Sequence, residues 1–186
     1  MKKLLNITLA LLAAFFILSC RNSDDDVPED VHEHDEIGKV VLTLTNKANA
    51  SDVQTISVIS GVADGHLHLH AGDTYFAVLD FQIKHDDHYH SSDEIEEEKD
   101  HHFITFNPAN ADIVVVRAAN DIVRTDGQKL GLRTEWTINS TQETGKMNIK
   151  LVHGPATVNQ NYPSAANQLG QTTGGETDVD ITVDAH

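Results

Sequence analysis

VVLTLT, residues 40–45, is the stretch that decides the fold class of this 186-residue chain. β-branched residues dominate it, and leucine alternates with threonine, which is typical of a strand with one buried face. Similar short segments rich in β-branched or aromatic residues follow at 53–59, 67–69, 75–83, 103–106, 113–116, 130–138, 147–152 and 179–183. We therefore predict about eight or nine strands.

Turn-forming residues separate these segments, at 46–51, 64–65, 71–73, 107–108, 126–127, 144–145 and 174–175. No window has the apolar periodicity of an amphipathic helix longer than about two turns. Strands joined by turns, without alternating helices, are typical of antiparallel sheets. We predict an all-β fold, a single antiparallel β-sandwich of immunoglobulin-like type, with a β-barrel as the alternative.

The first 19 residues have the features of a lipoprotein signal peptide. A basic start, Lys2-Lys3, precedes an apolar run at 4–18 that is too short to be a comfortable membrane span. The sequence ILSC at 17–20 has the small residue and the cysteine of a lipoprotein cleavage site. Cys20 is the single cysteine, so we exclude an intramolecular disulfide and predict that Cys20 carries the lipid anchor. The alternative is an ordinary secretory signal with a chance cysteine.

The rest of the chain divides into a tether and a domain. Residues 20–36 are polar, charged and poor in apolar side chains, so we predict a flexible acidic tether, followed by a β-sandwich domain at 37–186. The formal charge is −16, and removal of residues 1–19 would take away two lysines and no acid, giving −18. Such an acidic chain disfavours nucleic acid and anionic lipid as partners and suits cations.

Histidine is unusually common, with twelve residues in the chain. Imidazole with carboxylate is the ligand mixture that zinc accepts, whereas calcium and magnesium sites rarely recruit histidine. We predict a zinc site, with copper and nickel as alternatives. Ten of the histidines lie in three groups, namely His32 and His34; His66, His68 and His70; and His85, His88, His90, His101 and His102.

In the middle group the histidines alternate with leucines. If this segment is a strand, His66, His68 and His70 share one face while the leucines point into the core. Residues two apart lie about 6.5 Å from each other, so neighbouring histidines can share one ion, whereas His66 and His70, about 13 Å apart, cannot. The triplet thus needs further ligands. The expected source is segment 85–102, a loop or short polar extension with five histidines and eight acidic residues among its eighteen.

Each histidine group also has an interpretation without metal. Acidic, histidine-rich loops are often solvated charge that protects a sheet edge, and alternating histidines can be a half-exposed strand face. His32 and His34 fall in the tether, where this interpretation is favoured. His153, before Gly154, and the final residue His186 are most simply structural or incidental.

We do not predict an enzyme. A His-x-His pair with a third histidine resembles the zinc site of carbonic anhydrase, so a zinc hydratase or hydrolase is a further alternative. An excess of histidine and carboxylate, however, suits ion capture better than a single open catalytic position. The chain lacks the Gly-x-Ser-x-Gly and His-Glu-x-x-His motifs and a phosphate-cradling loop.

Several motifs carry a resemblance to a known family. SDDD at 23–26 resembles the acidic tag that follows the lipidated cysteine in surface-exposed lipoproteins of the Bacteroidota. Residues 69–75, the acidic run EIEEE at 94–98, residues 127–131 with Trp136, and above all GGETDVD at 174–180 resemble a family of small, mostly uncharacterised lipoproteins of flavobacteria and their relatives. The resemblance implies a β-sandwich displayed on the outer face of the outer membrane and association with a TonB-dependent receptor. It implies no catalytic or binding residue.

Together these observations predict a surface-exposed outer-membrane lipoprotein that binds a divalent transition metal at its histidine-rich, acidic face. Its role would be to capture the ion or deliver it to an outer-membrane receptor. The competing function is a metal-independent adhesion or complex-assembly module that holds a protein partner through a sheet edge or loops.

Overall fold

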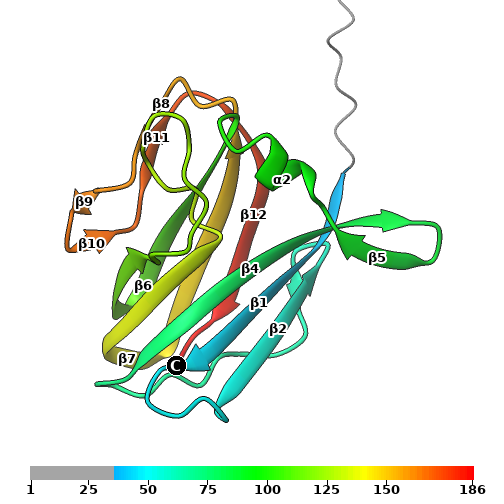
Figure 1. The fold of residues 1–186 in the computed structure, drawn as a ribbon. Helices are drawn as coiled ribbons and strands as arrows, with labels where there is room; N and C mark the ends of the chain where they lie inside the picture. The colour runs from blue at the N-terminus through cyan, green and yellow to red at the C-terminus, as the bar shows by residue number, and fades with distance from the viewer. Residues whose placement is uncertain (1–35) are drawn as a thin grey trace, which may run out of the picture. The chain divides into compact units, whose positions relative to one another are not determined.

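Strand β1 (Ile37–Asn46) contains the stretch 40–45 and pairs antiparallel with β2 (Val53–Ile59) on one side and β4 (Thr74–His85) on the other. Val40, Leu42 and Leu44 are buried, so the alternation in the sequence is an alternation of faces. The computed structural model describes residues 36–186 (Figure 1). The predicted signal peptide, the lipidation site Cys20, the acidic tag, and the tether histidines His32 and His34 lie outside the described residues.

The main sheet has eight strands in the order β12-β7-β4-β1-β2-β3, with β5 paired to β4 and β6 paired to β7. Two small ribbons, β8–β11 and β9–β10, and the short helix α2 complete the fold (Figure 1). The described residues contain no helix long and apolar enough to cross a membrane. The remaining elements are β3 (Val62–Ala63), β5 (His88–Ser91), α2 (Glu94–Glu97), β6 (His102–Arg117), β7 (Arg133–His153), β8 (Thr157–Asn159), β9 (Pro163–Ser164), β10 (Asn167–Gln168), β11 (Gln171–Thr173) and β12 (Glu176–Asp184).

Strands β6 and β7 are longer than the sequence predicts, because each continues through a predicted turn. The turns predicted at 107–108 and 144–145 are therefore wrong. In β6 the pairing shifts register between Ala109 and Ala111, and the buried side chains change from even-numbered to odd-numbered positions along the strand. Such bulges bend a strand without ending it. Gly145 is needed for a close approach, because a Cβ there would collide with the carbonyl oxygen of Ala185.

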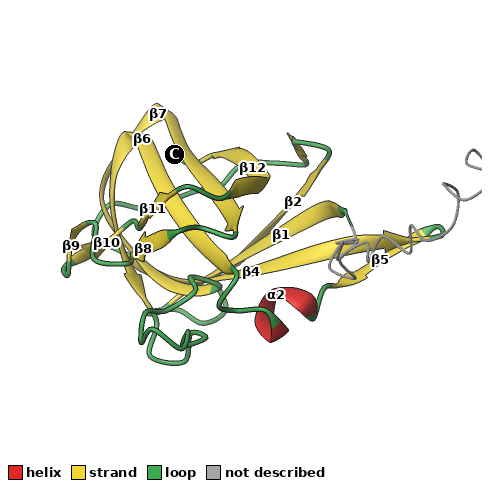
Figure 2. Ribbon diagram, turned by 90° about the horizontal axis from the view of Figure 1, so that it is seen from above, coloured by secondary structure: helices red, strands yellow, loops and turns green. Residues whose placement is uncertain are grey.

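The main sheet curls strongly into an antiparallel half-barrel around one apolar core (Figure 2). The prediction of an all-β antiparallel fold is confirmed, but the sheet does not divide cleanly into the two facing sheets of an immunoglobulin-like sandwich. The first half of β7 pairs with β4 and the second half with β12, so one bent strand belongs to both walls. Trp136 from the first half and Ile149 from the second are both fully buried in the same core.

The predicted strand at 67–69 is instead a single parallel bridge, between Leu67 and Ala185 beyond the end of β12. The side-chain amide of Gln54, on β2, accepts a hydrogen bond from the His68 backbone N–H (2.8 Å) and donates one to its carbonyl oxygen (2.7 Å). Segment 67–69 therefore connects the β2 side of the curled sheet to β12.

Candidate metal centre

The histidines predicted as ligands lie in different parts of the fold. His66 and His68 contact each other beside His186, with ring centroids 4.4 Å apart, while His85, His88 and His90 share the β4–β5 hairpin. His101 and His102 lie at the start of β6. The structure therefore does not bring the triplet His66, His68 and His70 together with segment 85–102 around one ion. The predicted alternation is present, since Leu67 and Leu69 are buried between exposed histidines.

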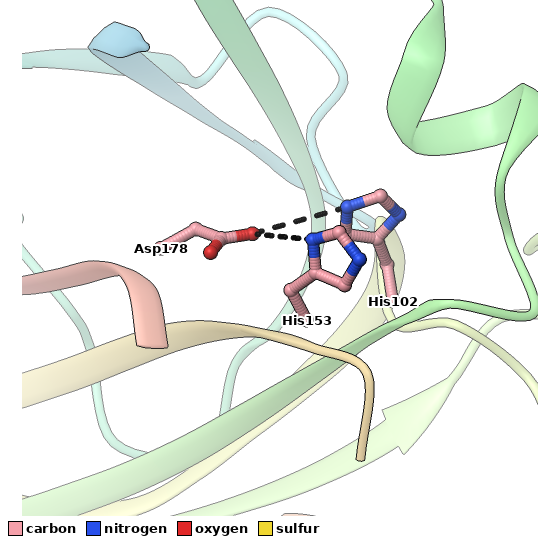
Figure 3. Close-up of side chains that lie close together, drawn as sticks. All are labelled: His102, His153 and Asp178. Atoms are coloured by element: carbon pink, nitrogen blue, oxygen red, sulfur yellow. Dashed lines mark ion pairs between the residues drawn. The ribbon is translucent and has the colours of Figure 1, made fainter. Parts of the chain in front are cut away.

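Among residues 36–186, one group of three potential ligands has all its ligand atoms within 4.8 Å of one another, namely His102, His153 and Asp178 (Figure 3). His102 begins β6 and lies directly opposite His153, the last residue of β7. On the other side of β7, strand β12 places Glu176 opposite His153, and the register then shifts between Thr177 and Val179. Asp178 lies at this irregularity, and bulges of this kind re-aim a side chain.

The distances within the group are slightly longer than those around a bound metal. The Oδ2 atom of Asp178 lies 3.9 Å from Nε2 of His102 and 3.7 Å from Nδ1 of His153, and the two imidazole centroids are 4.9 Å apart. Two ligand atoms of a tetrahedral zinc lie about 3.3 Å apart when each bond is about 2 Å. Metal binding therefore requires the Asp178 oxygen and the two imidazole nitrogens to move a few tenths of an ångström closer together.

Burial and a contact with a backbone carbonyl determine which ring nitrogen of His102 carries the proton. Its side chain is 2% exposed, against 24% for His153 and 31% for Asp178. Nδ1 of His102 lies 3.1 Å from the carbonyl oxygen of Glu98. A carbonyl oxygen can only accept a hydrogen bond, so Nδ1 carries the proton and Nε2 presents its lone pair on the side of Asp178. Protein metal sites use this arrangement to orient an imidazole ligand.

The environment also favours the neutral form of His102. Burial lowers its pKa below the ordinary value of 6.5, and proximity to His153 acts in the same direction. The contact with the Glu98 carbonyl and the negative charges of Asp178 and Glu98 raise the pKa but do not outweigh burial. At neutral pH His102 is therefore uncharged, which is the form that binds a metal.

A buried arginine holds the turn that leads into His102. Nη1 of Arg124 donates to the carbonyl oxygen of Lys99 (3.0 Å) and, through a short contact, to that of His102 itself. In the same turn, Asp100 accepts hydrogen bonds from the backbone N–H and the hydroxyl of Thr125 (2.6 and 2.5 Å). These contacts fix the backbone of residues 99–102, and with it the position of the His102 ring.

The donor set suits a transition metal. Two neutral imidazoles and one carboxylate are ligands of zinc, copper and nickel, and they partly neutralise a divalent charge. Three protein ligands leave one position of a tetrahedral site for water or for a donor from another molecule. The group of His102, His153 and Asp178 is consistent with the zinc prediction in ligand type.

The group differs in membership from the predicted ligands. Only His102 is among the predicted ligands, because the sequence favours a structural or incidental role for His153 and indicates no role for Asp178. His101 is exposed and its ring lies 6.2 Å from that of His153, outside the group of three. Only strand register brings residues 102, 153 and 178 together, and no local pattern in the sequence specifies it.

Comparisons of the chain with protein-family models, with curated proteins and with solved structures each find no match.

Proposed function

We propose that this protein is a surface-exposed outer-membrane lipoprotein that binds a divalent transition metal, zinc in the first place, through His102, His153 and Asp178. Its role is to capture the ion or deliver it to an outer-membrane receptor. The observation that carries the metal-binding part is the convergence of two imidazoles and one carboxylate from the ends of three strands.

The geometry of the site and the charge of the whole chain both support binding of a cation. The Nε2 lone pair of His102 and the carboxylate oxygen of Asp178 face the same space, and a cation placed there is attracted by both. The net charge of −16 also favours the approach of cations. We propose binding and not catalysis, because the chain offers many further histidines and carboxylates that suit ion capture.

Sequence features alone support the proposed location. The signal-peptide pattern, Cys20 and the acidic tag at 23–26 support lipid anchoring at the outer face of the outer membrane. The resemblance to flavobacterial lipoproteins supports the same location and a TonB-dependent receptor as the recipient of the ion.

One observation favours the competing function, a metal-independent adhesion or assembly module. Three apolar side chains at the β2–β3 edge of the sheet are exposed, Val53 by 52%, Ile59 by 41% and Val62 by 72%. Exposed apolar residues on an edge strand are a common means of docking a protein segment. This edge is separate in sequence from the three ligands, so the two functions can be tested separately.

The test is a calorimetric zinc titration at pH 7.5 and again at pH 5.5. We expect submicromolar binding at pH 7.5 that weakens at pH 5.5, because protonated imidazole has no lone pair to donate. His153→Gln combined with Asp178→Asn should weaken zinc binding at least about tenfold, since two of three ligands are lost. His70→Gln, which changes an exposed histidine outside the group, is the matched control.

Zinc affinity that is equal in the wild type and in the His153→Gln/Asp178→Asn variant would overturn the proposal. If a protein partner is instead captured without metal, and Val62→Lys abolishes its capture, the adhesion function is supported.

A further inference from the structure

The β4–β5 hairpin carries a second cluster of histidines that does not depend on the metal centre at His102. Its register pairs His85 with His88 and Ile83 with His90. In an antiparallel pair, directly opposite residues share a face, and residues two apart along one strand share it too. His85, His88 and His90 therefore project from the same face of the hairpin.

The three imidazoles form a nearly equilateral triangle. Their ring centroids are 6.0 Å apart for His85 and His88, 6.2 Å for His85 and His90, and 6.4 Å for His88 and His90. Three imidazoles on one tetrahedral metal have centroids about 5 Å apart, given metal–nitrogen bonds of about 2 Å. The side chains of His85 and His88 are 70% and 64% exposed, so rotations about their side-chain bonds can supply the difference.

All three rings have Nδ1 close to an oxygen atom. Nδ1 of His85 lies 3.5 Å from the carboxylate of Asp86, and Nδ1 of His88 lies 3.3 Å from that of Asp87. Nδ1 of His90 lies 3.2 Å from the carbonyl oxygen of Ser91. A proton on Nδ1 satisfies each of these contacts and makes Nε2 the ligand atom, as in carboxylate–histidine–metal arrangements.

The opposite face of the hairpin is attached to the main sheet. The ring of Tyr89 lies against Gly38, where an added Cβ would be only 3.0 Å from the ring carbon Cε1. The ammonium group of Lys39 lies 5.8 Å from the centroid of the same ring. The turn between His85 and His88 contains only Asp86 and Asp87, with Asp86 in the left-handed region at φ 55°. The backbone spacing of the three histidines is therefore held by a short turn and a docked tyrosine.

We infer that His85, His88 and His90 form a second, solvent-exposed transition-metal site built from three imidazoles. Exposed side chains impose little geometry on the ion, so its affinity for different metals follows the intrinsic order for nitrogen ligands, in which copper(II) binds most tightly. The remaining coordination positions face solvent, and the ion there exchanges with water and external ligands. This site differs from the metal centre at His102, where strand register sets the arrangement of the ligands.

The test uses the full chain in detergent micelles, with copper(II) sulfate as the probe. At substoichiometric copper(II), we expect paramagnetic broadening of amide signals centred on residues 83–91, and nitrogen hyperfine structure in the electron paramagnetic resonance spectrum. His85→Gln/His88→Gln/His90→Gln should remove one bound copper(II) ion per chain and abolish this broadening. His66→Gln/His68→Gln, which alters another exposed histidine pair, should leave the broadening at 83–91 unchanged.

Single substitutions test whether all three imidazoles bind. Each of His85→Gln, His88→Gln and His90→Gln should weaken copper(II) affinity at the hairpin at least about tenfold. Broadening that persists at residues 83–91 in the triple variant, or single variants with wild-type affinity, would overturn the inference. The titration is repeated in the His153→Gln/Asp178→Asn variant, where the hairpin should still bind copper(II). This variant therefore shows whether the hairpin binds copper(II) even if the proposed metal centre at His102 does not bind zinc.

Discussion

Burial lowers the pKa of the basic side chains at the two ends of β6, His102 and Arg117, but leaves them in different charge states at neutral pH. Burial lowers the pKa of Arg117 from its ordinary value to about 10, so its guanidinium stays charged at neutral pH and donates to the carbonyl oxygen of Ile104 (2.7 Å). Its charge also lies over the ring of Phe103, 4.4 Å from the centroid. The ordinary pKa of a histidine is 6.5, so the downward shift of the His102 pKa leaves its ring uncharged at neutral pH. The arginine thus remains a structural cation, while the histidine is in the neutral form that can bind a metal.

The depressed pKa of His102 predicts a pH dependence of stability in the metal-free protein. Below about pH 6.5 the unfolded chain takes up a proton that the buried ring resists, so the free energy of unfolding should fall as the pH falls through this range. Urea denaturation with a chelator at pH 7.5 and 5.5 measures the loss. In His102→Gln the loss over the same interval should be smaller. An equal loss in both proteins would show that His102 is not the group responsible.

At the scale of elements, the bends in β6 and β7 and the crossing segment 67–69 shape the sheet. The register shifts let one continuous pair of strands serve both walls of the half-barrel. Backbone hydrogen bonds attach segment 67–69 to the last residue of β12, from Leu67 to Asp184 (2.8 Å), and to the residues beyond it, from Leu69 to His186 (2.9 Å). Its attachment to β2 uses the side chain of Gln54 in place of a strand ladder. A single side chain therefore supports the connection between β2 and segment 67–69.

Gln54→Met should weaken this connection, because methionine has a similar size but no amide. Loss of two hydrogen bonds should lower the free energy of unfolding by about 1–2 kcal/mol. Hydrogen exchange of the His68 amide should become faster, since its acceptor is the Gln54 side chain. Gln142→Met, at an exposed position of β7, is the matched control and should change stability by less than about 0.5 kcal/mol. Unchanged His68 exchange in Gln54→Met would contradict this account.

At the scale of the whole molecule, the candidate metal centre lies where the ends of three strands meet. β6, β7 and β12 each contribute one ligand, so a bound ion links the two pairings that β7 makes near His153. An ion that binds only the folded state stabilises it by an amount that grows with the ratio of the free ion concentration to Kd. The unfolded chain lacks this arrangement of ligands and binds the ion less tightly.

Zinc should therefore raise the melting temperature. At a free zinc concentration 100-fold above Kd the folded state gains about 2.7 kcal/mol, which corresponds to roughly 5–10 °C for a domain of this size. Differential scanning calorimetry with and without zinc measures the shift. Magnesium at the same concentration should have little effect, and the shift should be largely lost in His153→Gln/Asp178→Asn. If zinc raised the melting temperature of that variant equally, the stabilising ion would bind at a site other than His102, His153 and Asp178.

The strand pattern was predictable where it depends on local sequence. The strand predicted at 53–59 matches β2, and the alternation in 40–45 matches the buried and exposed faces of β1. Prediction failed where residues typical of turns, Asn107-Pro108 and Thr144-Gly145, lie within long bent strands. A bulge and a turn use similar residue types, and only pairing with a neighbouring strand distinguishes them.

The sequence by itself determined the all-β class, the acidic charge and the supply of imidazole and carboxylate groups, because these depend on composition and on a periodicity of two residues. The tertiary structure decided that the sheet is a curled half-barrel, and that His102 meets His153 and Asp178. The physical reason is that strand register joins residues far apart in the chain, and a shift of one residue would turn each side chain to the opposite face.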